Sequence, residues 1–103
     1  MRTSTAAALV PALPHLATLT SGSKAVKQSK NRLRFYRPEK RVDVVNTPAI
    51  TEAVKSLMTL GASVTVYDDT HVWHPSLHGD LVVWSQGRPT SKAREGVTVQ
   101  ISL

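Results

Sequence analysis

The sequence predicts an α+β, or small α/β, protein in which an extended basic N-terminal arm precedes a compact domain of order β-α-β-β-β. Positive charge is gathered in the first 41 residues, and one main helix signal stands out at about residues 48–60. Short apolar runs around that helix have the length and alternation of strands. We therefore divide the chain into an arm, residues 1–41, and a small α/β domain, residues 42–103.

The basic charge of the chain belongs to the arm. Residues 1–41 contain nine Lys and Arg against a single acid, Glu39, whereas residues 42–103 contain four basic residues against six acids. Such a block of like charge is typical of a segment that meets an anionic partner, often nucleic acid. A solvated tail that only aids solubility is the alternative interpretation.

The composition excludes several classes of protein. There is no cysteine, which excludes disulfides and thiolate metal sites and agrees with a reducing compartment. No apolar run reaches the roughly 18 residues of a membrane-spanning helix. The acid-free N-terminus resembles a transit peptide, although Pro11 and Pro14 interrupt it. We expect a protein of the cytoplasm or of a particle, with no membrane partner, and mitochondrial import as the alternative.

Residues 24–41 form the candidate nucleic-acid-binding segment, because basic residues interleave there with two aromatic rings. Arginine pairs phosphate bidentately while rings stack on bases. In extended form, Arg32, Arg34 and Tyr36 would face one way, and Leu33, Phe35 and Arg37 the other. The candidate binding residues are Lys24, Lys27, Lys30, Arg32, Arg34, Phe35, Tyr36, Arg37, Lys40 and Arg41. No recognition-helix, zinc-finger or RNP motif appears, so we expect mostly electrostatic binding of RNA or DNA.

The helix has clear start and stop signals. It follows a short apolar segment, residues 42–46, which we interpret as a strand. Thr47 provides an N-cap, Pro48 the first helical position, and Gly61 the C-terminal stop. Between them one apolar stripe runs along the helix, formed by Ile50, Val54, Leu57 and Met58.

Further strands follow the helix. Ser63–Tyr67 completes a strand-helix-strand unit, which predicts two parallel strands. His71–His74 is a short strand candidate that Pro75 breaks. Leu81–Ser85 has no polar break before Ser85 and predicts a central strand buried on both faces. Residues 97–103 alternate apolar and polar side chains without a charge.

Self-association is expected on two grounds. A domain of about 62 residues buries a limited share of its surface and is marginal alone. An uncharged terminal strand is also a poor open edge. Both favour a homo-oligomer, or docking of strand 97–103 or of the arm onto a partner.

Two stretches resemble a known family. Residues 46–50 (Asn-Thr-Pro-Ala-Ile) and 61–69 (Gly-Ala-Ser-Val-Thr-Val-Tyr-Asp-Asp) are similar to the strand-helix-strand of Rossmann-type domains, most of all to the C-terminal domain of nucleotide-sugar dehydrogenases. The resemblance covers roughly a quarter of the chain. It implies βαβ geometry and no activity, since the sequence has neither a Gly-x-Gly-x-x-Gly motif nor a catalytic cysteine.

The densest polar cluster is the candidate for metal chemistry. His71, His74, His78 and Asp80 offer nitrogen and oxygen ligands for zinc or another divalent ion. Pro75 and Gly79 argue against a helix that would align the histidines. We therefore favour a polar loop whose histidines pack locally, and we expect no metal and no cofactor.

These patterns lead to one expected function and two alternatives. We expect a non-enzymatic protein that binds nucleic-acid phosphate through its basic arm. The alternative is a structural subunit of a large particle, such as a virion or a ribosome-like complex, whose arm packs on neighbouring subunits. A small metal-dependent hydrolase built on the His/Asp cluster is the third hypothesis.

Overall fold

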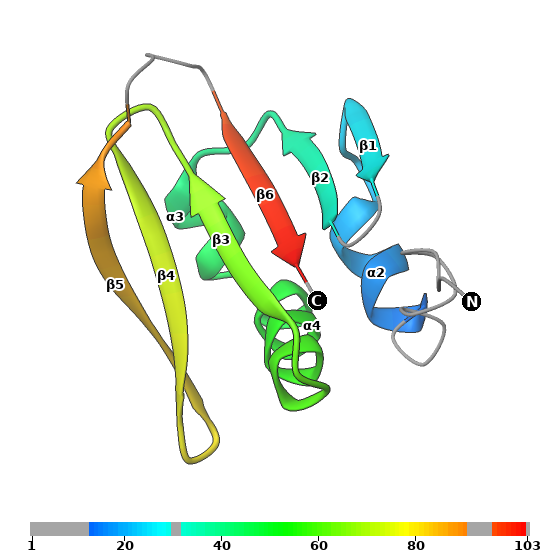
Figure 1. The fold of residues 1–103 in the computed structure, drawn as a ribbon, viewed down its shortest axis with the longest axis vertical. Helices are drawn as coiled ribbons and strands as arrows, with labels where there is room; N and C mark the ends of the chain where they lie inside the picture. Colours follow the sequence, from blue (N-terminus) through cyan, green and yellow to red (C-terminus); the bar gives the residue numbers. More distant parts are fainter. Residues whose placement is uncertain (1–12, 30–31, 91–95, 103) are drawn as a thin grey trace.

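A computed structural model describes residues 13–29, 32–90 and 96–102 of the chain. The described residues form a small α+β domain in which six antiparallel strands make one sheet, with three helices against one of its faces (Figure 1). The helices are α2 (Leu13–Thr20), α3 (Arg41–Val45) and α4 (Pro48–Thr59). The strands are β1 (Ala25–Ser29), β2 (Arg32–Arg37), β3 (Ser63–Tyr67), β4 (His71–His78), β5 (Leu81–Pro89) and β6 (Val97–Ser102). Their order across the sheet is β1-β2-β6-β3-β4-β5.

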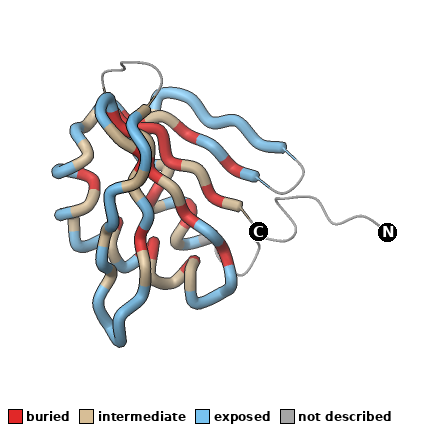
Figure 2. Tube along the Cα trace, turned by 60° about the vertical axis from the view of Figure 1, so that its left-hand side comes forward, coloured by how far each residue is buried: buried red, intermediate tan, exposed pale blue. Residues whose placement is uncertain are grey.

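The core lies between the sheet and the helices. Every second side chain of β2, β3 and β6 is buried there, for example Phe35 of β2 and Val99 of β6, each 1% exposed. Leu57 of α4 and Leu19 of α2 complete the core from the helices. Figure 2 shows the buried positions along the inner strands, whereas β1 is exposed throughout. We call the side of the sheet turned away from the helices the open face.

The predicted main helix is confirmed as α4. Thr47 occupies its N-cap position and Pro48 its first position, although the Thr47 side chain makes no capping hydrogen bond. At the other end Gly61 has a φ of +97°, and the N–H of Ala62 donates to the carbonyl of Leu57 at 3.0 Å. This bond is the Schellman arrangement that glycine permits, and it satisfies a carbonyl that the helix leaves without a partner.

The prediction of a strand at residues 42–46 is wrong, because this segment forms α3. Val44 enters the core, while Val42 is half exposed. The crossover to β3 starts from β2 instead. The strands β2 and β3 are parallel but not adjacent, since each pairs antiparallel with β6 between them. The strand β6 therefore lies between the two parallel strands, which the sequence had predicted to be neighbours.

The positions of the last two strands are the reverse of those predicted. β6 is an inner strand, and its Val97, Val99 and Ile101 are at most 1% exposed. β5 is an edge strand, with Leu81 69% and Val83 44% exposed. The pattern of apolar residues in a strand indicates which of its two faces is buried. It does not indicate whether the strand has a neighbour along each edge, because that depends on strands distant in the sequence. Both edges of residues 97–102 are paired within the sheet, with β2 and with β3.

β4 does not stop at Pro75 but runs on to His78. Its pairing with β3 ends at Trp73, which lies opposite Val66. Beyond Trp73 the strand pairs with β5 alone, in a hairpin that extends past the rest of the sheet (Figure 1). The missing N–H of Pro75 is tolerated because one edge of β4 has no neighbour there.

Segments that we assigned to the arm belong to the folded unit. α2 adds Leu16 and Leu19 to the core, and β1 and β2 form one end of the sheet. The predicted boundary at residue 41 therefore falls inside the domain, because Leu33 and Phe35 are core residues within the basic segment. Residues 1–12 lie outside the described residues. No helix in the described ranges has the length and apolar character that a membrane span requires.

Candidate nucleic-acid interface

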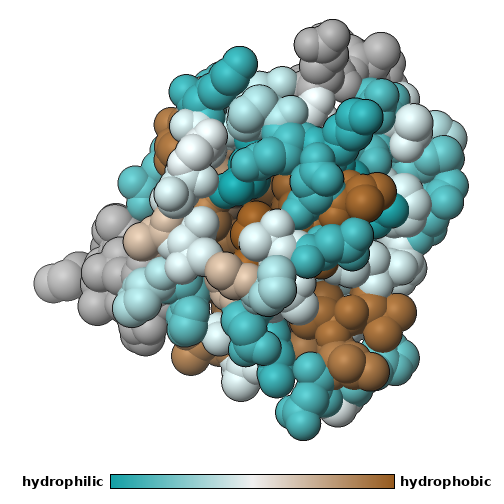
Figure 3. All heavy atoms as spheres, turned by 180° about the vertical axis from the view of Figure 1, so that it is seen from behind, coloured by the Kyte–Doolittle hydropathy of each residue, from teal (hydrophilic) through white to brown (hydrophobic). Residues whose placement is uncertain are grey.

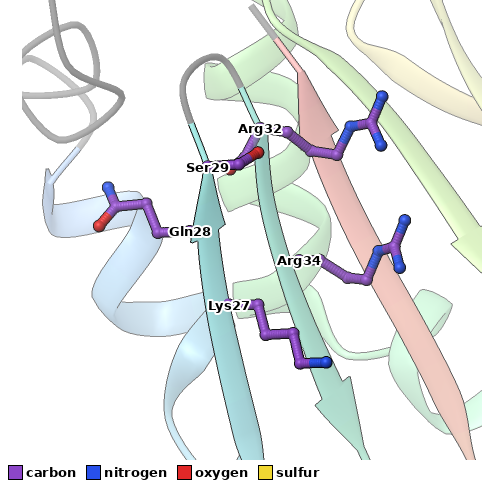
Figure 4. Close-up of a pocket in the computed structure, with 5 residues that line it drawn as sticks. All are labelled: Lys27, Gln28, Ser29, Arg32 and Arg34. Carbon is purple, nitrogen blue, oxygen red and sulfur yellow. The ribbon is translucent and has the colours of Figure 1, made fainter.

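Three of the predicted binding residues form a basic cluster on the open face. Lys27 on β1 and Arg32 and Arg34 on β2 are exposed and project to the same side of the sheet (Figure 4). The register places Lys27 directly opposite Arg34. Arg34 donates from Nη2 to Oε1 of Gln100 on β6 at 3.1 Å, which orients its guanidinium over the sheet. The cluster therefore depends on the pairing of β1, β2 and β6.

The basic cluster borders two shallow hollows of the surface. The larger has a volume of about 320 Å³ and is lined by Lys27, Gln28, Ser29, Arg32 and Arg34. The smaller, of about 210 Å³, shares Lys27 and Arg34 and extends to Tyr36 and Thr98. Both hollows are open to solvent, so an extended ligand can lie across them.

Uncharged polar groups and two rings continue the open face beyond the basic cluster. The row through Arg34 runs on to Gln100 and then to Thr65 of β3. The next row towards the α3 end of β2 holds Tyr36, Thr98 and Tyr67, with both tyrosines half buried. These groups offer hydrogen bonds and aromatic edges beside the positive charges.

The described strands around the basic cluster supply no compensating acid. Strands β1, β2, β6 and β3 contain neither Asp nor Glu. Like charges directly opposite each other on an antiparallel pair are destabilising. The positions of Lys27 and Arg34 therefore favour a bound anion. The helix-covered side has a different character, with apolar patches among its polar residues (Figure 3).

Phe35 and Arg37 are not available to a ligand, which corrects two predicted binding residues. Both point to the helix side, since odd positions of β2 face the core. The Arg37 side chain donates to both carboxylate oxygens of Glu39 at 2.8 Å, to the carbonyl of Ser21 at 2.9 Å and to that of Leu19. Arg37 therefore anchors the end of α2 to β2.

Arg41 also has a structural role. Its guanidinium lies 3.7 Å from the centre of the Trp73 ring, and its Nε is 3.7 Å from Oδ2 of Asp68. The same Oδ2 accepts the indole N–H of Trp73 at 2.8 Å. Arg41 is thereby committed to holding β4 against the start of α3.

The Asp68 carboxylate is the best-satisfied charge in this part of the domain. Its Oδ1 accepts the backbone N–H groups of Thr70 and His71 and the Thr70 hydroxyl, all within 2.9 Å. Burial alone would raise the pKa of Asp68, but these bonds and the Trp73 N–H together lower it below its ordinary value of 3.8. The connection between β3 and β4 is organised around this side chain.

The remaining predicted binding residues lie beside the basic cluster, apart from it, or outside the described residues. Lys24 precedes β1 and Lys40 precedes α3, and both are exposed. Lys30 falls outside the described residues, and Tyr36 lies on the open face beside the cluster.

The His/Asp cluster does not converge. His71, His74 and His78 all lie on β4, where residues four apart are separated by about 13 Å. Asp80 is paired with Lys55 of α4 at 3.5 Å. Within the described ranges, no three His, Asp or Glu side chains are grouped so that they could hold a metal ion.

Comparisons of the chain with protein-family models, with curated proteins and with solved structures find no match. The candidate interface therefore depends on its geometry. Sequence reasoning missed Gln100, Thr65 and Tyr67 as members of this surface. The alternation of side chains along their strands could be predicted from the sequence. Which strands lie next to one another in the sheet could not.

Proposed function

We propose that this protein is a non-enzymatic nucleic-acid-binding protein that contacts the phosphate backbone with Lys27, Arg32 and Arg34 on the open face of its sheet. One observation carries the proposal. Lys27 of β1 lies directly opposite Arg34 of β2, and the four neighbouring strands β1, β2, β6 and β3 contain no Asp or Glu. A polyanion laid across these strands would offset their mutual repulsion.

The spacing of the cations favours a chain of phosphates over a single small anion. Arg32 and Arg34 are two residues apart on one strand, which separates them by about 7 Å. Each arginine can therefore pair a different phosphate with its planar fork of donors, while Lys27 adds a point charge between the strands. The open hollows beside them leave room for a continuous backbone.

The neighbouring polar groups favour a single strand with little sequence preference. Tyr36 and Tyr67 flank Thr98 in one row of the open face and present rings beside the phosphate-binding residues. Exposed bases of a single strand can stack on such rings, and stacking tolerates all four bases. Gln100 and Thr65 add hydrogen bonds without a recognition helix.

The double variant Lys27→Ala/Arg34→Ala tests the proposal. Fluorescence anisotropy with short single-stranded RNA and DNA of mixed sequence would measure the dissociation constant from about 50 mM to about 200 mM salt. We expect weaker binding and a salt slope reduced by about 1.4, because each lost phosphate contact on a single strand lowers the slope by about 0.7. A wild-type protein that does not bind at low salt would contradict the proposal.

A matched control removes the same net charge elsewhere. Lys40→Ala/Lys55→Ala changes the residue before α3 and one on α4, away from the basic cluster. Its salt slope should stay close to that of the wild type. Equal losses in the two double variants would show that binding follows net charge, and the assignment to the open face would then fail.

A further inference from the structure

The residues of the open face lie in rows that cross the sheet. The row through Arg34 continues to Gln100 of β6, and the row through Arg32 continues to Ser102 of β6 and Ser63 of β3. These two rows are two residues, or about 7 Å, apart along each strand. Each row runs from a cation on β2 towards the middle of the sheet.

Charged and uncharged groups are separated along these rows. The cations of the basic cluster stand on β1 and β2, whereas the open-face positions of β6 and β3 carry hydroxyl groups and the amide of Gln100. A nucleotide is divided in the same way, into a charged phosphate and an uncharged base. When Arg32 and Arg34 pair successive phosphates, as in the proposed function, the bases have room over β6 and β3. The base beside Arg34 then meets Gln100.

The Gln100 amide has a defined orientation. An arginine side chain has only donors, so the Gln100 atom that meets the Arg34 guanidinium must be the amide oxygen. Arg34 donates from Nη2 to this Oε1 at 3.1 Å. The other branch of the amide, Nε2 with its two N–H groups, donates to no protein group among the described residues, and Gln100 is only half buried. These two donors are therefore available to a ligand on the open face.

We propose that Gln100 selects bases that carry a carbonyl group where their counterparts carry an amino group, so that uracil or thymine binds more tightly than cytosine, and guanine more tightly than adenine. This inference rests on the proposed function, because it concerns a base joined to the phosphate at Arg34. Nε2 of Gln100 donates to O4 of uracil or thymine, or to O6 of guanine. Cytosine and adenine have a donor at the corresponding place, and two donors do not form a hydrogen bond.

The other groups of the open face do not distinguish these bases. Hydroxyl groups both donate and accept, and aromatic rings stack on all four bases. The amino group of cytosine would have to share Oε1 of Gln100 with Arg34, beside the further positive charge of Lys27. One hydrogen bond gained or lost therefore gives a preference of about three- to tenfold.

Strands of a single pyrimidine test the selection, because every position is the same and the register of binding does not matter. Fluorescence anisotropy at about 50 mM salt would measure the dissociation constants of strands of about ten uracil or ten cytosine nucleotides, as RNA and as DNA. The wild type should bind the uracil strand about three- to tenfold more tightly. Gln100→Met, which has no donor, should bind both strands equally. Gln100→Glu, which has only acceptors, should prefer the cytosine strand.

Matched variants separate this selection from charge and from general effects of the substitution. Gln28→Met makes the same change on β1, where the side chain points away from the basic cluster (Figure 4), and should keep the preference for uracil. Arg32→Met and Arg34→Met each remove one positive charge and should weaken binding of both strands. Only Arg34→Met releases the Gln100 amide, so only this variant should also lose the preference.

The ratio of the two dissociation constants decides the proposal. A wild type that binds both strands equally, a Gln100→Met variant that keeps the preference, or equal ratios in Arg32→Met and Arg34→Met would overturn it and leave phosphate binding by the open face intact. A wild type that binds neither strand at low salt would contradict the proposed function itself and this inference with it. The circular dichroism spectrum of each variant would confirm that it is folded.

Discussion

At the scale of single residues, two arginines of one strand have opposite roles. Arg34 is exposed on the open face, whereas Arg37, three positions later, is 6% exposed and bonded to Glu39 and to two carbonyls of the α2 region. The difference follows from strand alternation alone, since odd and even positions point to opposite faces. A basic segment is therefore not a uniform binding surface once it lies in a sheet.

Asp68→Asn tests the most heavily bonded carboxylate. Removing the charge weakens four hydrogen bonds, so we expect the free energy of unfolding to fall by about 2–3 kcal/mol at neutral pH. Urea denaturation measures the change. Asp69→Asn is the matched control, because Asp69 is exposed, and it should alter the free energy by less than about 0.5 kcal/mol.

The pH dependence of the same carboxylate has a defined sign. The pKa of Asp68 is lowered on folding, so its charge contributes stability fully above the ordinary value of 3.8 and loses that contribution as the pH falls through the lower folded value. The wild type should therefore lose more stability below pH 3.8 than Asp68→Asn does. Parallel pH profiles of the two proteins would contradict this assignment.

At the scale of elements, the entry into β6 is the most constrained backbone position described. Gly96 has a φ of +84°, and a Cβ there would lie 2.5 Å from the carbonyl oxygen of Arg37 and 2.7 Å from the Tyr36 hydroxyl. The close approach brings the start of β6 against the end of β2. Only glycine meets both conditions without moving the backbone.

Gly96→Ala should therefore lower the free energy of unfolding by about 3 kcal/mol, from the strained φ together with the contact on the Arg37 carbonyl. Thermal or urea denaturation measures the loss. Gly22→Ala is a close control, because Gly22 has a φ of +81° but no atom within 4 Å of the added Cβ. We expect about 1 kcal/mol there. Similar losses in both variants would mean that the close contact has no effect.

At the scale of the whole molecule, α2 belongs to the core. Leu19 is 0% exposed and packs with residues of the sheet and of α4. The alternative role as an assembly subunit assigned the arm, residues 1–41, to packing on neighbouring subunits. The part of the arm within α2 packs instead on its own domain. The assembly role itself stays a prediction.

Leu19→Ala tests this integration. A cavity under α2 should lower the free energy of unfolding by about 2–5 kcal/mol, as for other fully buried leucines. Chemical denaturation measures the loss, and Leu60→Ala is the control, since Leu60 is 55% exposed. Equally small losses in both variants would indicate that α2 does not contribute to the core and would restore the interpretation of an independent arm.

The elements that could be predicted from the chain alone are those whose signals are local. The helix at residues 48–59 has its cap, its stripe and its glycine stop within residues 47–61. The facing of residues 32–37 and 97–102 followed from alternation, and the burial of their odd positions confirms it. Lys27, Arg32 and Arg34 were named as candidates from charge and position, and their binding role stays a prediction.

Strand neighbours were decided only in three dimensions. Whether β6 is an edge or an inner strand, and whether residues 42–46 are a strand or a helix, depends on which distant segment occupies the adjacent position in the sheet. The candidate interface has the same origin, because Lys27, Arg34 and Gln100 come together only through the pairing of β1, β2 and β6. The pattern of side chains in a strand shows which face is buried. The edges of a strand are instead paired through backbone N–H and C=O groups, and these are the same in every residue but proline, so the sequence does not indicate which strand is the neighbour.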